Sequence, residues 1–245
     1  QTPNPKPQTP HHPFFCYIFN LVKNLHQLPV TDINMRLSRR LISQSEIDTL
    51  NRRLLIQVDK FDKKIGEVPM YEAHTRQAIE KGIIHRAFSL FVLDDKGRLL
   101  LQRRSAAKMT FPLCWSNTVC SHPLSSLNEA ESSEFAGVKK AAMRRLFEEL
   151  RVDRKKSPEI FEWKGSFFYT AMHDDTLGES EFDHVLLAKT PLSPQELALF
   201  DPKEVAELKL VPLDKVEDFQ REVTAKGEKF TPWFNQALSV LRKAL

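Results

Sequence analysis

Two apolar runs separated by a short turn place the strongest constraint on the fold. Residues 87–93 are AFSLFVL, residues 98–102 are RLLLQ, and the DDKG between them carries a glycine where a tight turn needs one. The pattern predicts two strands joined as a hairpin. His85 then stands at the entrance to the first strand, and Arg103 and Arg104 stand at the exit of the second. A sheet with polar groups at its strand ends is therefore expected at the centre of the fold.

Strand and helix patterns alternate along the rest of the chain. Strand composition occurs at residues 54–59, 160–172, 181–190 and 205–211, and helical spacing of apolar residues at 132–150, 212–227 and 231–245. Ser132 or Ser133 is the expected N-cap of the first of these helices. The order of elements predicts an α/β protein, a mixed sheet with helices on its faces.

The length of 245 residues suits one core with an extension. We expect residues 51–245 to form the domain. Residues 1–50, which begin QTPNPKPQTPHHP, are expected to be a largely disordered N-terminal extension. No apolar run approaches the roughly 18 to 20 residues that cross a bilayer, so no membrane span is expected.

Cysteine usage and charge bear on compartment and partners. Three dispersed cysteines, Cys16, Cys114 and Cys120, argue against a disulfide framework and favour a reducing compartment. We expect a cytoplasmic location, with peroxisome and mitochondrion as alternatives, and a monomer or weak dimer. The net charge of +4 is mild, and we expect no nucleic-acid partner. The basic residues occur in pairs, which is typical of a solvated face or of a phosphate site.

The stretch WSNTVCSHPL puts Cys120 and His122 one residue apart, without a nearby cysteine to complete a zinc ribbon. A buried free thiol and a strand-ending histidine are the ordinary structural explanation. Other groups that can bind metals stand at loop or strand-end positions: His74, His85, Glu179 and Glu181. The two glutamates are two apart and can face one side of a strand. Three imidazoles and two carboxylates suit Zn²⁺ or Mn²⁺, or Mg²⁺ if oxygen ligands dominate.

A second group of residues fits an anion. Glu148 and Glu149 follow Arg144 and Arg145 in the expected helix 132–150, which is typical of a salt-bridged surface but also fits a Mg²⁺-diphosphate site. Arg104 and Lys108 are four residues apart and could bind the same anion. The aromatic residues Tyr169 and Trp233 are by default interpreted as core or rim residues.

Six segments in this order resemble one family, the type I isopentenyl-diphosphate isomerases of the Nudix superfamily. They are IIHRAFSLFVL, LLLQRRSAAKMTFP, SNTVCSHPL, RRLFEEL, GESEF and TPWF. The resemblance covers about residues 52–245. It implies a Nudix-type α/β/α sandwich and the conversion of isopentenyl diphosphate to dimethylallyl diphosphate in isoprenoid and sterol biosynthesis. Ordinary Nudix proteins lack the combination of SNTVCSHPL, HRAFS and an E-x-E pair.

The resemblance also implies roles for individual residues. Cys120 and Glu181 match the two catalytic acid/base groups, and Tyr169 matches a tyrosine that hydrogen-bonds the glutamate. The octahedral metal site would be formed by His74, His85, His122, Glu179 and Glu181. Glu149 matches the acid that holds a second ion, Mg²⁺, on the diphosphate. The remaining matches are the diphosphate-binding bases Arg104, Lys108 and Arg145 and the aromatic that covers the isoprenyl tail, Trp233.

Two departures from family patterns keep alternatives open. Met70 stands where the family usually has a lysine, so one diphosphate contact is missing unless Lys63 or Lys64 replaces it. This favours, as one alternative, a degenerate homologue that binds diphosphate without turnover. Arg145 stands at the second position of the hydrolase pattern R-E-x-x-E-E, which argues against the other alternative, a Nudix diphosphate hydrolase.

Overall fold

The computed structural model describes residues 42–131, 133–152, 158–190 and 198–245. The chain divides into two units, Gln1–Leu41 and Ile42–Leu245. The first unit, which makes up most of the predicted extension, lies outside the described residues. Helix α3 (Gln44–Asn51) occupies the end of that extension. Its N-cap Ser43 forms a capping box with Glu46, which satisfies amides that the first helical turn leaves free. The boundary at residue 50 stays a prediction.

The remaining elements follow in chain order. The strands are β1 (Leu54–Val58), β2 (Lys64–Pro69), β3 (Ile84–Leu93), β4 (Arg98–Arg104), β5 (Trp115–Ser116), β6 (Val119–Ser121), β7 (Phe161–Met172), β8 (Gly178–Lys189) and β9 (Val205–Pro212). The helices after α3 are α4 (Met70–Ala73), α5 (Arg76–Glu80), α6 (Ala136–Leu150), α8 (Val216–Ala225) and α9 (Phe234–Lys243). None of the described helices has the length and apolar character that a membrane crossing requires.

Strand β3 is the centre of the sheet. It pairs parallel with β8 and antiparallel with β1, β4 and β6. Beyond these neighbours, β2 pairs with β1, β7 with β8, and β5 and β9 with β4. The sheet is therefore mixed, as predicted.

The predicted hairpin is confirmed only around its turn. Gly97 has φ of 71°, and the Asp94 carboxylate accepts hydrogen bonds from the amides of Lys96 and Arg98. The turn is therefore stabilised by its own residues. The strands pair only at Leu93 and Leu99. Beyond that point β3 pairs with β6 and β4 pairs with β5, while β9 pairs along the other edge of β4.

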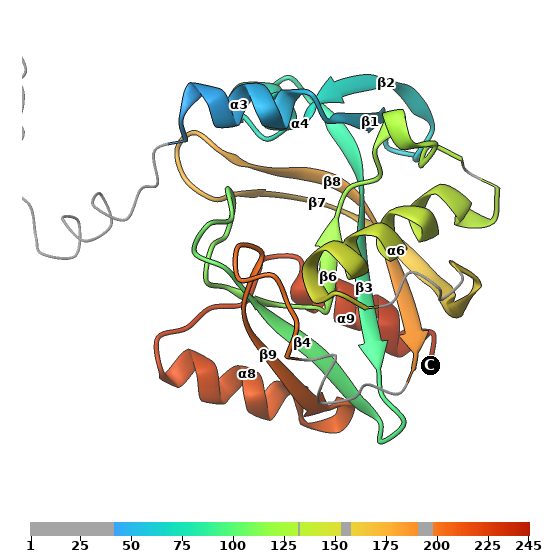
Figure 1. Ribbon diagram of the computed structural model, residues 1–245, viewed down its shortest axis with the longest axis vertical. Coiled ribbons are helices and arrows are strands. Elements are labelled where there is room, and N and C mark those ends of the chain that lie inside the picture. Colours follow the sequence, from blue (N-terminus) through green and yellow to red (C-terminus); the bar gives the residue numbers. More distant parts are fainter. Residues whose placement is uncertain (1–41, 132, 153–157, 191–197) are drawn as a thin grey trace, which may run out of the picture. The chain divides into compact units, whose positions relative to one another are not determined.

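Helices cover both faces of the sheet because apolar side chains alternate along its strands. On β8, Leu186 and Ala188 join the core under α6, whereas Val185 and Leu187 join the core under α8 and α9. Figure 1 shows α6 crossing one side of β3 and β6, with α9 behind the strands. This arrangement confirms the predicted α/β/α sandwich.

The start of α6 differs from the prediction. Ser133 is not its N-cap but part of a 3-10 turn, Ser133–Phe135, and Ser132 lies outside the described residues. The N-cap is Phe135, with φ of 60° and no side-chain cap. The preceding loop holds the first turn instead: the Gly137 amide donates to the Glu131 carbonyl at 3.0 Å. A Cβ at Gly137 would lie 2.2 Å from another loop carbonyl, so only glycine fits there.

Candidate active site

Five side chains with metal-binding groups come from separate elements of the sheet and its margins. His74 is the C-cap of α4, His85 lies on β3, and His122 follows β6. Glu179 and Glu181 lie on β8, two residues apart and on one face. The parallel register of β3 and β8 puts His85 opposite Glu181. Sheet pairing therefore brings together residues that are distant in the sequence.

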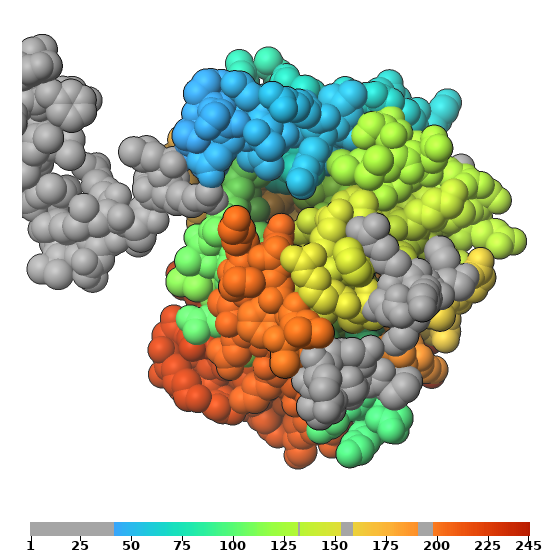
Figure 2. Space-filling view, in the orientation of Figure 1, coloured from blue at the N-terminus to red at the C-terminus, as the bar shows by residue number. Residues whose placement is uncertain are grey.

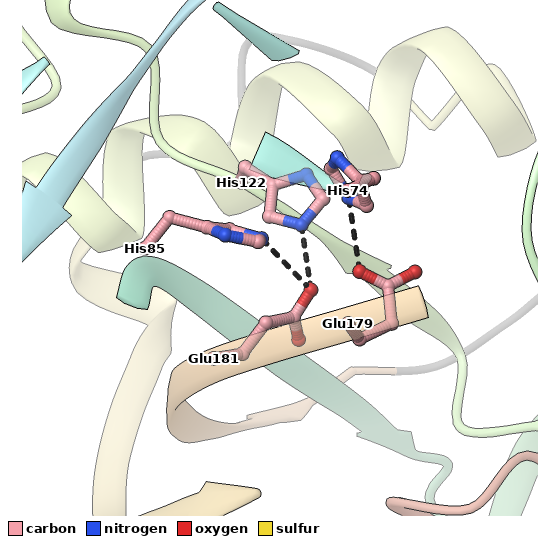
Figure 3. Close-up of side chains that lie close together, drawn as sticks. All are labelled: His74, His85, His122, Glu179 and Glu181. Carbon is pink, nitrogen blue, oxygen red and sulfur yellow. Dashed lines mark hydrogen bonds and ion pairs between the residues drawn. The ribbon is translucent and has the colours of Figure 1, made fainter. Parts of the chain in front are cut away.

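The ligand atoms of these five residues all lie within 4.8 Å of one another. In Figure 3 the three imidazoles lie side by side and face the two carboxylates: His74 Nε2 is 2.9 Å from Glu179 Oε2, and His122 Nε2 is 2.7 Å from Glu181 Oε1. His85 Nε2 is 3.4 Å from the same Glu181 oxygen. Four of the five residues are buried, and His122 is partly exposed. We call this group the His/Glu cluster.

Burial and neighbouring charges shift the pKa values in the His/Glu cluster. Burial lowers the pKa of His74, but the adjacent Glu179 outweighs it and raises the pKa to about 9. Burial dominates at His85 and lowers its pKa to about 3, so this ring is neutral. Burial raises the pKa of Glu181, yet the hydrogen bond with His122 and the nearby His85 ring hold it well below its usual range. The cluster therefore contains an ionised carboxylate and a neutral imidazole, both of which are forms that bind metals.

The donor set fits a divalent metal ion. His85 Nε2 and Glu179 Oε2 are buried and lack a hydrogen-bond partner among the described residues, although each faces an ionisable neighbour. Buried polar atoms without a hydrogen bond are rare and are often explained by an ion. Imidazole and carboxylate together suit Zn²⁺ and Mn²⁺, and Mg²⁺ takes the oxygen ligands.

Three further groups orient the ligands, as the outer partners of metal ligands commonly do. Two of them are hydroxyls and one is a backbone carbonyl. The pairs are Thr110 Oγ1 donating to Glu179 at 2.5 Å, Tyr169 Oη donating to Glu181 at 2.5 Å, and His74 Nδ1 with the Met70 carbonyl oxygen at 2.6 Å. Met70 therefore contributes through its backbone, while its side chain packs against the core residues around Leu55.

Cys120 lies on β6, outside the His/Glu cluster. Its sulfur is 3.6 Å from Arg104 Nη1 and 3.7 Å from Ser116 Oγ. Burial raises the pKa of the Cys120 thiol to about 11, and the opposing charge of Arg104 does not reverse the shift. The thiol is therefore protonated near neutral pH. Arg104 is held in place by the carbonyls of Phe111 and Thr110, to which it donates two further hydrogen bonds.

A second ionic group, the α6 cluster, consists of Lys108, Arg145, Glu148, Glu149 and Glu204. Arg145 Nη2 is 2.5 Å from Glu149 Oε1, and Arg145 Nη1 is 2.8 Å from Glu148 Oε2. Lys108 Nζ is 3.5 Å from Glu149 Oε1. Glu149 is fully buried. The helical spacing of three and four residues aligns Arg145 with both glutamates, as the sequence predicted.

Trp233 links the surroundings of Cys120 to those of Glu181. The Arg104 guanidinium lies over its ring at 5.5 Å, and the Tyr169 ring is 5.6 Å from it. Its Nε1 donates to Asn117 Oδ1 at 3.2 Å, which fixes the indole. Because Arg104 also contacts Cys120 and Tyr169 also contacts Glu181, Trp233 is connected to each of the two through one side chain.

The structure thus brings the predicted residues into connected groups. The five predicted metal ligands meet in the His/Glu cluster, and Lys108, Arg145 and Glu149 meet in the α6 cluster. Arg104 lies against Cys120 and makes no ion pair with the α6 cluster in the described residues. Sequence reasoning missed Thr110, Ser116 and Glu204. Thr110 and Ser116 belong to quoted motifs, and Glu204 stands in no motif, so only its distance from Arg145 reveals it.

The surface near these groups is hollowed. In Figure 2 a depression lies between α3 (blue), α6 (yellow), the segment 105–114 (green) and the segment before β9 (orange). The last three carry or adjoin residues of the α6 cluster.

Comparison with known proteins places the chain in a family. A profile of the NUDIX domain matches residues 83–234. Isopentenyl-diphosphate Delta-isomerase 1 of Bos taurus is 37% identical over 200 residues, which cover 79% of this chain and 86% of the relative. The chloroplastic isopentenyl-diphosphate Delta-isomerase 1 of Cannabis sativa is 39% identical over 197 residues, covering 77% and 67%.

A solved structure agrees on the fold. The crystal structure of DR0079 from Deinococcus radiodurans matches with a TM-score of 0.52 and 20% identity, covering 78% of this chain and 98% of that one. The family resemblance that the sequence motifs indicated is confirmed by the curated relatives. The chain belongs to the NUDIX-domain proteins and, among them, to the isopentenyl-diphosphate Delta-isomerase family.

Proposed function

We propose that the protein converts isopentenyl diphosphate to dimethylallyl diphosphate, with Cys120 and Glu181 as the two groups that move protons. The observation that carries this assignment is their arrangement. A protonated thiol and an ionised carboxylate are each connected to the indole of Trp233 through one side chain, Arg104 for the thiol and Tyr169 for the carboxylate.

The chemistry requires such a pair. Moving the double bond adds a proton to one carbon of the substrate and removes a proton from another, through a tertiary carbocation-like state. An alkene is a very weak base, so the proton donor must be held against it and water must be kept away from the cation. One of Cys120 and Glu181 donates the proton and the other accepts one, so the numbers of protons balance. The face of Trp233 stabilises the positive charge by cation-π attraction.

Hydrogen bonding positions Glu181 for this role. Tyr169 donates to one carboxylate oxygen at 2.5 Å, and the other is 2.7 Å from His122 Nε2. The residues that would hold a metal ion are those of the His/Glu cluster. A bound divalent ion supplies positive charge that favours the ionised form of Glu181. We infer Zn²⁺, Mn²⁺ or Mg²⁺ there from the mixture of imidazole and carboxylate donors.

The diphosphate serves as the handle of the substrate. We propose that Arg104, Lys108 and Arg145 bind it and that Glu149 holds a Mg²⁺ ion on it. Arg104 contacts Cys120, and Lys108 and Glu149 are near enough for their charges to act on the Cys120 thiol. The binding energy of the diphosphate can then hold the alkene between the catalytic groups. Hydrolysis is disfavoured because Arg145 occupies a position where a hydrolase carries a carboxylate, and here its guanidinium neutralises Glu149.

Methionine in place of lysine at position 70 still leaves other basic residues that can bind the diphosphate. Met70 is packed against apolar residues. Lys64, on β2, forms an ion pair with Glu67 at 2.8 Å and a hydrogen bond with Ser125 at 3.3 Å. Lys64 is thus committed to other partners. The three remaining bases would bind the diphosphate, and a homologue without turnover stays the alternative that the assay below distinguishes.

The test is turnover of isopentenyl diphosphate with Mg²⁺ in deuterated water. We expect dimethylallyl diphosphate that carries deuterium, and no released phosphate. Cys120→Ala should abolish product formation with unchanged metal content, whereas the matched control Cys114→Ala should leave turnover intact. Phosphate release would indicate a hydrolase, and neither product would indicate a degenerate homologue. Full activity of Cys120→Ala would exclude the thiol from the reaction.

A further inference from the structure

Glu204 contacts both basic residues of the α6 cluster. Its carboxylate pairs with Lys108 Nζ and lies 3.1 Å from Arg145 Nη2. The same two cations also face Glu149. Glu204 therefore occupies, with Glu149, the positions around Lys108 and Arg145 where the oxygens of a diphosphate would otherwise bind.

Backbone hydrogen bonds fix Glu204 in this place. The Ser105 amide donates to the Glu204 carbonyl at 3.0 Å, and the Ser105 hydroxyl binds the carbonyl of Lys203. The Asp201 amide donates to the Glu149 carbonyl at 2.8 Å. The segment before β9 is thus attached to the end of β4 on one side and to the end of α6 on the other. Its carboxylate is a built part of the site and not a loose surface group.

The charges of the α6 cluster do not favour a bare anion. Lys108 and Arg145 contribute two positive charges, and Glu149 and Glu204 contribute two negative ones, so these two cations are already balanced by carboxylates. Glu148 is shared between Arg145 and Arg144, at 2.8 and 3.3 Å. Burial raises the pKa of Glu204, but Lys108 and Arg145 outweigh it and lower the pKa to about 2. Glu204 is therefore ionised under ordinary conditions. A diphosphate without a metal ion would meet two carboxylates at the cations that should attract it.

We propose that Glu204 is a built-in competitor for Lys108 and Arg145 that makes the pocket accept a diphosphate only together with Mg²⁺. This rests on the proposed function for its diphosphate site. With Mg²⁺ on the diphosphate, the added positive charge offsets the carboxylates of Glu149 and Glu204. Glu204 acts on substrate binding through the two cations, so it is a positioning and selectivity residue and not a catalytic one.

The experiment measures binding of inorganic diphosphate by isothermal titration calorimetry, with and without Mg²⁺ in the buffer. The proteins are the wild type, Glu204→Gln and Glu204→Asp. Gln keeps the shape and removes the charge, whereas Asp keeps the charge. We expect Glu204→Gln to bind Mg²⁺-free diphosphate about tenfold tighter than the wild type, since one repulsive charge a few ångströms away is removed. The ratio of the affinities with and without Mg²⁺ should fall to the same extent, and Glu204→Asp should keep the wild-type ratio.

Matched controls separate this effect from a change in net charge or in folding. Glu217→Gln removes one carboxylate that pairs with Arg242 on another part of the surface, and its ratio should equal that of the wild type. Thermal unfolding of each variant reports whether the fold is intact. An unchanged ratio in folded Glu204→Gln would overturn the proposal. So would weaker binding of the Mg²⁺ complex alone, because Glu204 would then be a metal ligand.

Failure of the proposed function has a different signature. If the wild type binds no diphosphate even with Mg²⁺ and does not turn over isopentenyl diphosphate, the anchor assignment itself is wrong. If it turns over the substrate and Glu204→Gln shows the wild-type Mg²⁺ dependence, only the role of Glu204 is refuted.

Discussion

Replacing Tyr169 with phenylalanine isolates one hydrogen bond at the carboxylate proposed to move protons. The Tyr169 hydroxyl donates to Glu181 Oε2 at 2.5 Å, and the side chain is buried. Phenylalanine keeps the ring, so the contacts with Trp233 and Phe167 at 5.6 and 5.8 Å remain. The substitution therefore removes the donor and little else.

The expected magnitude follows from the charge of the acceptor. A hydrogen bond to an ionised group contributes about 1.5 to 3 kcal/mol. If Tyr169→Phe loses all of it in the transition state, kcat falls roughly 10- to 150-fold, since each 1.36 kcal/mol is a factor of ten. KM should change little, because Tyr169 lies outside the α6 cluster that we propose binds the diphosphate. The assay is steady-state conversion of isopentenyl diphosphate at saturating Mg²⁺.

The matched control is Tyr71→Phe, which deletes a hydroxyl that makes no hydrogen bond in the described residues, and it should leave kcat unchanged. Equal kcat values for Tyr169→Phe and wild type would show that the bond does not contribute to the reaction. A large rise in KM at constant kcat would instead assign Tyr169 to substrate binding, and would contradict the separation of the two groups drawn above.

Three further predictions concern the metal and the fold. Since the pKa of His74 is raised to about 9, a metal ion must displace the proton of this ring. At about pH 8 metal binding should therefore release a proton, and the affinity for the metal should rise with pH up to about 9. Calorimetry in buffers of different ionisation enthalpy measures this, and no release would refute it. His85→Ala should lower metal content, measured by mass spectrometry, while Cys120→Ala retains it. Gly137→Ala should lower the free energy of unfolding by about 1 to 3 kcal/mol in urea, because its Cβ would overlap the Glu129 carbonyl; an unchanged midpoint would contradict that contact.

Local patterns in the sequence predicted what depends on local chemistry. The alternation on β8 put Glu179 and Glu181 on one face, and the structure confirms it. The hairpin prediction held at its turn, where Gly97 and Asp94 act locally. It failed along the strands because β6 pairs with β3 and β5 pairs with β4 at the edges where the two strands would have met. Ser133 was wrong as an N-cap for the same reason, since packing of the preceding loop decides where α6 begins.

The gathering of the metal-binding residues depends on distant pairing. His85 and Glu181 meet because β3 and β8 pair in a parallel register, which no spacing in the chain reveals. The resemblance to a known family supplied that grouping in advance, whereas residue patterns alone left it open. Glu204 shows the opposite case: it stands in no motif, and only the ends of β4 and α6 bring it to Lys108 and Arg145.

The sheet also bears on our proposal that a thiol and a carboxylate act on one small substrate. Ser89 on β3 pairs with Cys120 of β6 on one edge and with Val185 of β8 on the other. Neighbouring strands lie about 4.8 Å apart, so β6 and β8 are held roughly 10 Å apart across β3. Cys120 and Glu181 are thus carried by strands on opposite edges of β3, and neither can move toward the other without breaking backbone hydrogen bonds. A reaction that adds a proton at one carbon and removes one from another needs two such groups kept apart, because a thiol and a carboxylate in direct contact would exchange the proton with each other.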